Sequence, residues 1–325
     1  MAGGGQVVID VARVGLCGTD VEFFTGDMAY LHQGHSAYPI RIGHEWSGTV
    51  AAAGEGVDDA WVGRRVTGDT MLGCGRCERC LGGHQHLCAD RFEIGIRGGW
   101  PGALGEQLVV PATSLHALPH SVDDEAAAMV EPGGNALRAA DAAGAPAAAP
   151  ARAGLPERVL VWGAGTIGLL AGLFARARGH AEVHVVGRSP TSIALASDLG
   201  FAASTIGDMP VAAFDAVIDA TDDASVPARA LDLVEPGGRV VYVGLAGGPS
   251  LVDTRTLALK DVTAVGILSG SPGLAATIDE YASGRVDPRP LVAATVGLAE
   301  VSAVLGGWRP PEAGRGPKIL VDPRR

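Results

Sequence analysis

The feature that most constrains the fold is the segment 159–168, which reads V-L-V-W-G-A-G-T-I-G. Its four leading apolar residues are typical of a strand buried on both faces, and Gly163, Gly165 and Gly168 follow directly. The next residues, 169–179, are mostly apolar and end on a glycine, as a buried helix does. A strand, a glycine turn and a helix in this order predict a dinucleotide-binding site.

Each glycine of this turn has its own physical role. The first permits the tight turn, the second lets the backbone approach a pyrophosphate, and the third lets the helix pack close to the strand. The helix N-terminus adds N–H groups and a positive dipole, which favour phosphate. Chance is an alternative source of the motif because the chain holds 48 glycines. The flanking strand and helix favour the nucleotide site.

Length and charge limit the other possibilities. A chain of 325 residues is long enough for two domains. Its 25 basic and 36 acidic residues give a net charge of −11, spread without long runs, which argues against a nucleic acid or a membrane surface as partner. The sequence has neither an apolar run long enough for a membrane span nor a signal-peptide pattern at its start, so we expect a cytoplasmic location.

Four of the five cysteines lie within fifteen positions, at Cys74, Cys77, Cys80 and Cys88. Four thiolates separated by glycine-rich loop suit a closed, structural zinc site, and clustering in a cytoplasmic chain favours metal over disulfides. An iron–sulfur cluster or a set of reduced surface cysteines is the alternative. We expect His84 and His86, which lie between these cysteines, to be solvated.

The two halves of the chain differ in pattern. The first part predicts a small β-barrel or sandwich without helical periodicity, with strands at 6–16, 49–53, 63–67, 108–111 and 114–118. A helix at 133–143 and an Ala/Pro-rich linker at 144–155 follow. From residue 158, strands (184–186, 214–219, 240–243, 262–267) alternate with helices (191–199, 226–234), which predicts a doubly wound parallel sheet. A helix near 273–283 and a strand at 318–321 end the chain.

Four further residues are candidates for a catalytic metal site: Cys17, His44, Glu45 and Glu131. They are too far apart to form a local finger, but each stands at an expected turn or strand end, from which side chains can converge on one metal. A lone cysteine is usually a small buried hydrophobe, and a lone histidine usually a satisfied surface or core residue. Spacing alone does not decide between these readings.

With these residues in place, the chain resembles the zinc-dependent medium-chain alcohol/polyol dehydrogenases along nearly its whole length. The matching pieces are, in order, C-G-T-D (17–20), G-H-E (43–45), the cysteine cluster (74–88), M-V-E-P (129–132), G-A-G-T-I-G (163–168) and P-G-G-R-V-V (236–241). The resemblance implies an α/β protein: a GroES-like β-barrel catalytic domain (1–133 and 269–325) around an inserted Rossmann domain (134–268), with a cleft for zinc, substrate and nicotinamide.

The resemblance also implies the roles of the candidate site residues. Cys17 and His44 match two ligands of the catalytic zinc, and Glu131 matches the third. Glu45 is implied either as a direct ligand or as an outer group that exchanges with water. Thr19 matches the hydroxyl that takes the substrate proton.

Proton release is less defined. Glu22 stands where many members carry a relay histidine, so the proton leaves through His35 or through bulk water. The resemblance implies that a bound zinc would supply Lewis acidity toward the alcohol oxygen, and that a nicotinamide would accept the hydride from carbon. We hypothesise that carboxylate ligands make a harder metal site, suited to a vicinal diol.

Cofactor preference can be argued from one position. About twenty residues past the glycines, NAD enzymes carry an acidic residue that binds the ribose 2′-hydroxyl. Here Gly187 takes that place, followed by Arg188 and Ser189, which favours NADP over NAD. A solvated Arg188 that stacks on adenine is the alternative. The residues predicted to contact the cofactor are Gly163, Gly165, Thr166, Ile167, Gly168, Arg188, Ser189, Thr221, Val243 and Gly244.

The sequence thus predicts an NADP-preferring, zinc-dependent dehydrogenase of a secondary alcohol: a polyol, sugar or cyclitol. The alternatives are an NAD-dependent threonine-type or simple alcohol dehydrogenase, and a catalytically silent zinc protein that binds nucleotide. Family members are dimers or tetramers, and 262–268 is the expected edge strand. We expect the loops at 23–42 and 92–100 to line the substrate pocket. The family carries a longer segment before C-G-T-D, so we expect a missing edge hairpin or a late chain start.

Overall fold

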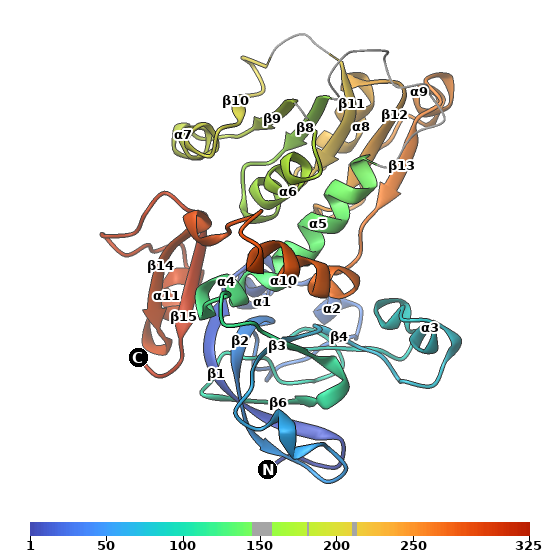
Figure 1. The fold of residues 1–325 in the computed structure, drawn as a ribbon. Coiled ribbons are helices and arrows are strands. Elements are labelled where there is room, and N and C mark those ends of the chain that lie inside the picture. The colour runs from blue at the N-terminus through green and yellow to red at the C-terminus, as the bar shows by residue number, and fades with distance from the viewer. Residues whose placement is uncertain (145–157, 181, 210–212) are drawn as a thin grey trace. The chain divides into compact units, whose positions relative to one another are not determined.

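The computed structural model describes residues 1–144, 158–180, 182–209 and 213–325 (Figure 1). The chain divides into two compact units: unit 1 is Met1–Gly134 with Ser269–Arg325, and unit 2 is Asn135–Leu268. Except for its first residue, the expected Ala/Pro-rich linker at 144–155 lies outside the described residues.

Unit 1 is built on a sheet in which β1 is the central strand. Within the described residues this sheet has seven strands in the order β14-β15-β1-β2-β3-β7, with β6 also paired to β1. The strands are β1 (Gln6–Gly15), β2 (Glu45–Ala53), β3 (Arg65–Gly68), β6 (Gln107–Pro111), β7 (Leu115–Ala117), β14 (Val292–Gly297) and β15 (Lys318–Asp322). The first half of β1 pairs with β6, and the last residues of β1 pair with β15. The first strand of the chain is therefore not an unpaired edge of the sheet.

The core of unit 1 follows from the alternation along β1. The fully buried Val7, Ile9 and Val11 point to one side, where they join Trp46 in one apolar cluster. A separate two-stranded sheet, β4 (Met71–Leu72) with β5 (Phe92–Glu93), flanks the cysteine-rich segment.

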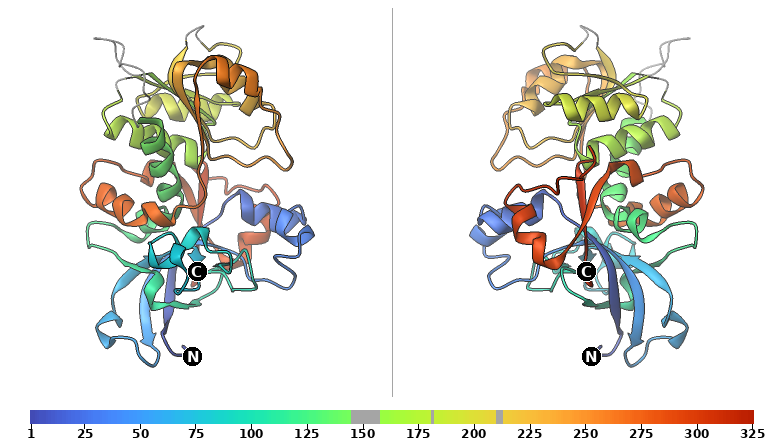
Figure 2. Two further views of the ribbon diagram at one scale, coloured as in Figure 1. Left: turned by 90° about the vertical axis from the view of Figure 1, so that its right-hand side faces the viewer. Right: turned by 90° about the vertical axis from the view of Figure 1, so that its left-hand side faces the viewer.

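Short helices complete unit 1, and the first of them was not expected. They are α1 (Gly18–Thr25), α2 (Ala29–His32), α3 (Glu78–Leu81), α4 (Asp124–Ala128), the start of α5 (Val130–Gly144), α10 (Leu274–Ala282) and α11 (Val301–Leu305). The prediction that this region lacks helices was wrong because α1 is held by its ends. Cys17 and Asp20 form a reciprocal capping box, and Gly26 ends the helix in a left-handed conformation. Helices α1 and α11 lie side by side (Figure 2).

Unit 2 is a parallel sheet in the order β10-β9-β8-β11-β12-β13, which confirms the predicted α/β, doubly wound class. Its strands are β8 (Arg158–Trp162), β9 (Glu182–Val186), β10 (Ala202–Ser204), β11 (Phe214–Asp219), β12 (Val234–Tyr242) and β13 (Thr263–Gly266). Its helices are the remainder of α5, α6 (Thr166–Ala177), α7 (Pro190–Asp198), α8 (Val226–Leu233) and α9 (Thr254–Leu259).

Helices cover both faces of this sheet. Leu160 and Trp162 of β8 pack in one cluster with Ala230 of α8, whereas the alternate residue Val161 faces Gly168 of α6. Because both faces are buried, the strands read as continuous apolar runs rather than as alternating ones. Strand β12 continues through residues 236–238, where the sequence predicted a break, and takes up the extra residues in a register shift against β11.

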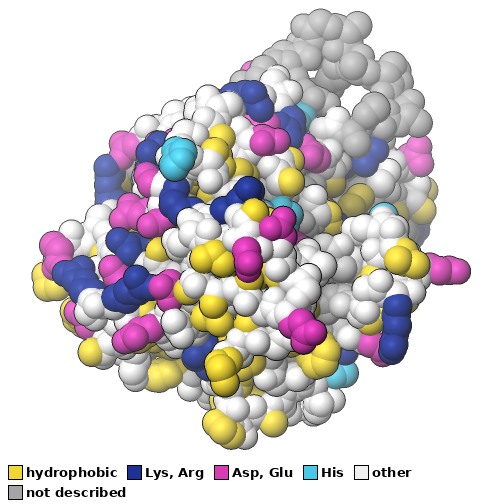
Figure 3. Space-filling model, turned by 60° about the horizontal axis from the view of Figure 1, so that its bottom comes forward, with side chains coloured by type: hydrophobic (Ala, Val, Ile, Leu, Met, Phe, Trp, Pro, Cys, Tyr) yellow, Lys and Arg dark blue, Asp and Glu magenta, His cyan; other side chains and the backbone are white. Residues whose placement is uncertain are grey.

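The surface of the described residues is mixed in charge. On the face in Figure 3, acidic and basic side chains are interspersed with apolar and neutral ones. Among the helices of the described ranges, none combines the length and the apolar character needed to cross a membrane.

Candidate active site

Three of the four residues proposed for a catalytic metal lie together in unit 1. Cys17 follows the end of β1, and Glu45 begins β2 opposite Gly15 in the antiparallel register. The potential ligand atoms of Cys17, His44 and Glu45 all lie within 4.8 Å of one another, and Cys17 Sγ is 3.5 Å from His44 Nε2. Gly15 leaves room for the Glu45 carboxylate, which a Cβ at this position would overlap. We call these three residues the catalytic cluster.

The geometry of the catalytic cluster fits zinc. In a tetrahedral site with bonds of about 2.3 Å to sulfur and about 2.0 Å to nitrogen, these two ligands are about 3.5 Å apart. In the structure, Cys17 Sγ and His44 Nε2 are 3.5 Å apart. Thiolate, imidazole and carboxylate are all donors that zinc accepts.

Asp20 holds the two ligand-bearing segments together. Its Oδ2 accepts a hydrogen bond of 3.0 Å from the Cys17 N–H, and its Oδ1 accepts one of 3.1 Å from the Gly43 N–H. This carboxylate is almost fully buried, and burial raises its pKa, an effect that the charge of His44 opposes. The sequence analysis did not assign Asp20 a role. Its spacing from Cys17, three residues, is the capping-box signal that could have found it.

Lys318 is the second residue that the sequence analysis missed. It begins β15, its side chain is only 2% exposed, and its Nζ lies 2.5 Å from Glu45 Oε2. The same Nζ donates a hydrogen bond of 2.8 Å to the Leu16 carbonyl. The sequence feature that could have identified it is a lysine at the start of an apolar strand, in a chain with only one other lysine.

The electrostatics of the catalytic cluster favour positive charge. Burial alone lowers the pKa of His44, but the neighbouring Cys17, Asp20 and Glu131 raise it well above its ordinary value. Burial likewise lowers the pKa of Lys318, and the charges of Glu45 and Cys17 outweigh it, so that the net shift is upward. Anionic groups therefore dominate the local potential, as a cation site requires.

Glu131 approaches the catalytic cluster without joining it. It lies in the first turn of α5, is buried, and is near enough to raise the pKa of His44, but it is not part of the group within 4.8 Å. The start of α5 is fixed by α10, because the Tyr281 hydroxyl donates a hydrogen bond of 3.1 Å to the Met129 carbonyl. Thr19 is half-buried in the first turn of α1, two residues after Cys17.

The other four cysteines form a second cluster, the cysteine lobe (residues 74–88). All four sulfur atoms lie within 4.8 Å of one another, with Cys74 and Cys80 4.0 Å apart and Cys77 and Cys88 3.8 Å apart. Sulfur ligands on a tetrahedral zinc are about 3.8 Å apart, so the geometry fits a closed site. Hydrogen bonds from the Arg76 and Cys77 N–H groups lower the pKa of Cys74 to about 6.

The two histidines of the cysteine lobe differ. His84 is exposed, as expected, but His86 is buried and stacks on it. The prediction that His86 is solvated was wrong because the short helical turn at 85–87 buries this side chain, which composition does not reveal.

In unit 2, the glycine turn has the geometry expected of a dinucleotide site. Gly163 has φ +114°, and a Cβ there would meet the Ala220 carbonyl. A Cβ on Gly168 would overlap the Gly163 carbonyl, whereas one on Gly165 would meet nothing. The third glycine therefore allows close packing, and the second leaves the backbone open to a ligand.

Thr221 and Gly244 lie at the carboxyl ends of β11 and β12. A Cβ on Gly244 would overlap the Thr221 backbone, so these two chain segments are in direct backbone contact. The Val243 and Gly244 N–H groups both donate to the Asp219 carbonyl, each at 3.0 Å. Ligands of doubly wound sheets bind at this edge, outside the carboxyl ends of the strands.

Comparison with known proteins identifies the family. Residues 3–120 match the family model described as alcohol dehydrogenase GroES-like domain, and residues 166–283 match the model described as zinc-binding dehydrogenase. An L-threonine 3-dehydrogenase of Mesorhizobium japonicum is 32% identical over 279 residues, covering 82% of this chain and 76% of that protein. The chain belongs to the zinc-dependent medium-chain alcohol/polyol dehydrogenase family.

Solved structures agree with this assignment. A zinc-binding dehydrogenase from Sinorhizobium meliloti 1021 bound to NADP is 27% identical, with a TM-score of 0.85 over 99% of this chain and 93% of that one. A protein of Escherichia coli CFT073 described as a short chain alcohol dehydrogenase, complexed with NADH, is 26% identical, with a TM-score of 0.84 and the same coverage. This chain is therefore an enzyme of the alcohol dehydrogenase type, with the predicted GroES-like and Rossmann parts.

In this dehydrogenase, the predicted 2′-phosphate contacts lie on an exposed turn after β9. Arg188 is 87% exposed, and its guanidinium is 3.7 Å from the Asp222 carboxylate. Ser189 caps α7, accepting a hydrogen bond of 3.1 Å from the Ser192 N–H. Gly187 has little room for a side chain, because a Cβ would lie 2.8 Å from Ser192 Oγ.

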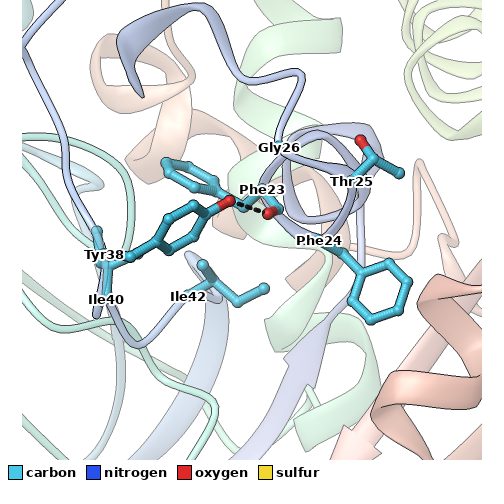
Figure 4. Close-up of a pocket in the computed structure, with 7 residues that line it drawn as sticks. All are labelled: Phe23, Phe24, Thr25, Gly26, Tyr38, Ile40 and Ile42. Atoms are coloured by element: carbon cyan, nitrogen blue, oxygen red, sulfur yellow. Dashed lines mark hydrogen bonds between the residues drawn. The ribbon is translucent and has the colours of Figure 1, made fainter. Parts of the chain in front are cut away.

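A cavity of about 470 Å³ opens beside α1 of the dehydrogenase, along one of the two loops expected to line the substrate pocket. Figure 4 shows Phe23, Phe24, Tyr38, Ile40 and Ile42 around it, with the Tyr38 hydroxyl donating to the Phe23 carbonyl. None of the catalytic-cluster residues lines this cavity, so it is not the place of the chemistry.

Proposed function

We propose that the dehydrogenase oxidises a secondary alcohol, a polyol, sugar or cyclitol, with NADP as the preferred acceptor. The observation that carries this proposal is the catalytic cluster. Its three zinc-compatible donors, Cys17 and the consecutive His44 and Glu45, lie within 4.8 Å of one another. The glycine turn of unit 2, with its open second glycine, supports the nicotinamide cofactor.

The proposed roles follow the geometry of unit 1. Cys17, His44 and Glu131 hold the catalytic zinc, with Glu45 beside them, and the cysteine lobe holds a structural zinc. When bound, the catalytic zinc supplies Lewis acidity toward the alcohol oxygen. Thr19, in the first turn of α1, takes the alcohol proton through its hydroxyl. Among the described residues no hydrogen bond engages that hydroxyl, which leaves it available.

Arg188 carries the proposed preference for NADP. With no carboxylate at position 187, nothing there repels a 2′-phosphate, and the exposed guanidinium is free to leave its weak surface ion pair with Asp222. Guanidinium is the side chain best suited to phosphate because its N–H groups match the phosphate oxygens.

A second candidate function has specific support. The relatives of this chain include several L-threonine 3-dehydrogenases, from Mesorhizobium japonicum and Rhizobium johnstonii among others. The hydroxyl of threonine is a secondary alcohol, so the same cluster suits it. This alternative enzyme is the NAD-dependent, threonine-type dehydrogenase.

We further propose a homodimer or homotetramer in the cytoplasm. Strand β13 pairs only with β12 among the described residues, and Leu245, Leu251 and Leu259, which lie between β12 and β13 in the chain, are strongly exposed. An unpaired strand edge with apolar neighbours favours pairing with a second copy. Five cysteines, none of them in a disulfide, fit a reducing compartment.

The test is a substrate panel with both cofactors. Polyols, sugars, cyclitols and L-threonine are assayed with NADP and NAD at the nicotinamide absorbance. We expect the highest kcat/KM with a polyol-type substrate and NADP. In Arg188→Ala we expect kcat/KM to fall about tenfold with NADP and to stay unchanged with NAD. The control Arg324→Ala removes another exposed, ion-paired arginine, and it should leave kcat/KM unchanged with either cofactor. Preference for NAD and L-threonine would establish the second candidate instead.

A further inference from the structure

Two oppositely charged side chains of unit 2 meet beside the glycine turn. Arg188 follows the end of β9, and Asp222 follows the end of β11. In the sheet, β8 lies between these two strands, and the glycine turn continues directly from β8. The Arg188 guanidinium and the Asp222 carboxylate are nevertheless only 3.7 Å apart. The pair therefore joins the two loops that flank the glycine turn.

Close contacts fix both of these loops against the turn. A Cβ on Gly163 would lie 2.7 Å from the Ala220 carbonyl oxygen, in the loop after β11. On the other side, a Cβ on Gly187 would lie 3.2 Å from the Ala164 Cβ. The backbone that forms the predicted dinucleotide site thus also sets where the two charged side chains begin. Both begin at the carboxyl edge of the sheet, where ligands of doubly wound sheets bind.

The two consecutive carboxylates after β11 have different surroundings. Asp223 Oδ1 accepts hydrogen bonds from the Ser225 N–H at 2.9 Å and from the Ser225 hydroxyl at 2.8 Å, and these bonds lower the pKa of Asp223. The Asp222 side chain is 76% exposed, and its contact with Arg188 is the one interaction that its carboxylate makes within the described parts of the chain. Asp222 is therefore the carboxylate that is available to act on the arginine.

The contact between Arg188 and Asp222 is loose. Its 3.7 Å separation exceeds hydrogen-bond distance, and both side chains are mostly exposed, so charge alone holds it together. A phosphate group carries up to about two negative charges at neutral pH. At this place it would meet a guanidinium that attracts it and a carboxylate that repels it.

We propose that Asp222 is a specificity-determining residue that opposes the 2′-phosphate of NADP. It does so by occupying the Arg188 guanidinium and by placing a negative charge beside it. NAD has a hydroxyl in place of this phosphate, so its binding does not depend on Asp222. The inference rests on the proposed preference for NADP and deepens it: Arg188 raises the affinity for NADP, and Asp222 limits that gain.

The experiment is a calorimetric titration of the full-length enzyme with adenosine 2′,5′-bisphosphate and with 5′-AMP. These two probes differ only in the 2′-phosphate, and their binding is measured without turnover. Asp222→Asn keeps the shape of the side chain and removes its charge. We expect the Kd of the bisphosphate to fall about fivefold in this variant and the Kd of 5′-AMP to stay unchanged.

Salt separates an effect of charge from an effect of loop structure. At about 0.5 M NaCl the gain in Asp222→Asn should shrink to less than about twofold, because salt screens exposed charges. A structural change in the loop would alter the binding of both probes and would persist in salt. The control Asp10→Asn removes a carboxylate that is paired with the exposed Arg324 at 3.2 Å in unit 1, and it should leave both Kd values unchanged.

The variant Arg188→Ala distinguishes failure of this inference from failure of the proposed cofactor preference. If Arg188→Ala weakens binding of the bisphosphate but Asp222→Asn does not strengthen it, the role of Asp222 alone is refuted. An equal gain for both probes in Asp222→Asn also refutes that role. If the wild-type enzyme binds the two probes equally and Arg188→Ala changes neither Kd, the proposed preference for NADP and this inference fail together.

Discussion

The two clusters of unit 1 are assembled in opposite ways. The cysteine lobe takes all its candidate ligands from fifteen consecutive positions, whereas the catalytic cluster and its supports come from residues 17 to 318. Local turns set the sulfur positions in the lobe. In the catalytic cluster, strand pairing and the buried groups Asp20 and Lys318 set the donor positions. The metal site of the cysteine lobe can therefore be disrupted without affecting the rest of unit 1, whereas the catalytic cluster depends on the pairing of the whole sheet.

The largest effect is expected when a proposed ligand of the catalytic cluster is removed. In His44→Ala we expect zinc to fall from two ions to one per chain and kcat/KM to fall by about 10⁴-fold, because the Lewis acid is lost. Metal analysis and initial rates measure this. His84→Ala is the control, since that histidine is exposed in the lobe, and it should change neither quantity. Full activity in His44→Ala would remove the catalytic role of the cluster.

Asp20→Asn tests whether the catalytic cluster depends on its backbone clamp. An amide replaces one acceptor oxygen with an N–H donor, so one of the hydrogen bonds to Cys17 and Gly43 is lost. We expect zinc affinity at this cluster to fall by about 10- to 100-fold, with the lobe unaffected, measured by chelator competition.

A matched control exists in unit 2. Asp253 also accepts hydrogen bonds from backbone N–H groups, those of Arg255 and Thr256, but it caps α9. Asp253→Asn should leave both zinc sites intact. Equal metal loss in the two variants would mean that the clamp at Asp20 has no specific role.

The smallest effect on activity is expected in the cysteine lobe. Cys88→Ser should lose the lobe zinc and lower Tm by about 10 °C, while kcat/KM changes by less than about fivefold, because the lobe supplies no donor to the catalytic cluster. Calorimetry and initial rates measure this. A loss of activity as large as that of His44→Ala would show that the two clusters are coupled.

The same contrast explains what the sequence could predict. The cysteine spacing and the strand–glycine–helix pattern are local. The structure has the four sulfur atoms grouped together and a glycine turn between β8 and α6, as these patterns predict. Helix α1 was missed because its eight residues are too few for periodicity, and its capping pair includes a cysteine. The grouping of Cys17, His44 and Glu45 needed the family resemblance, since pairing of β1 with β2 creates it.

Lys318 and Glu131 mark the limit of sequence reasoning. The partner of Lys318 is 273 positions away, so no spacing rule connects them. Glu131 was expected at a strand end or turn but lies in a helix, which leaves it outside the group of closest donors. Residues whose place depends on tertiary pairing are those that local patterns cannot locate.

The most direct test of the central claim is zinc X-ray absorption of the wild-type enzyme. The five cysteines supply all the thiolate sulfur available. We predict two zinc ions per chain that share five sulfur ligands at about 2.3 Å, with nitrogen and oxygen ligands at about 2.0 Å at the catalytic cluster. One zinc ion per chain with four sulfur ligands only would contradict the account.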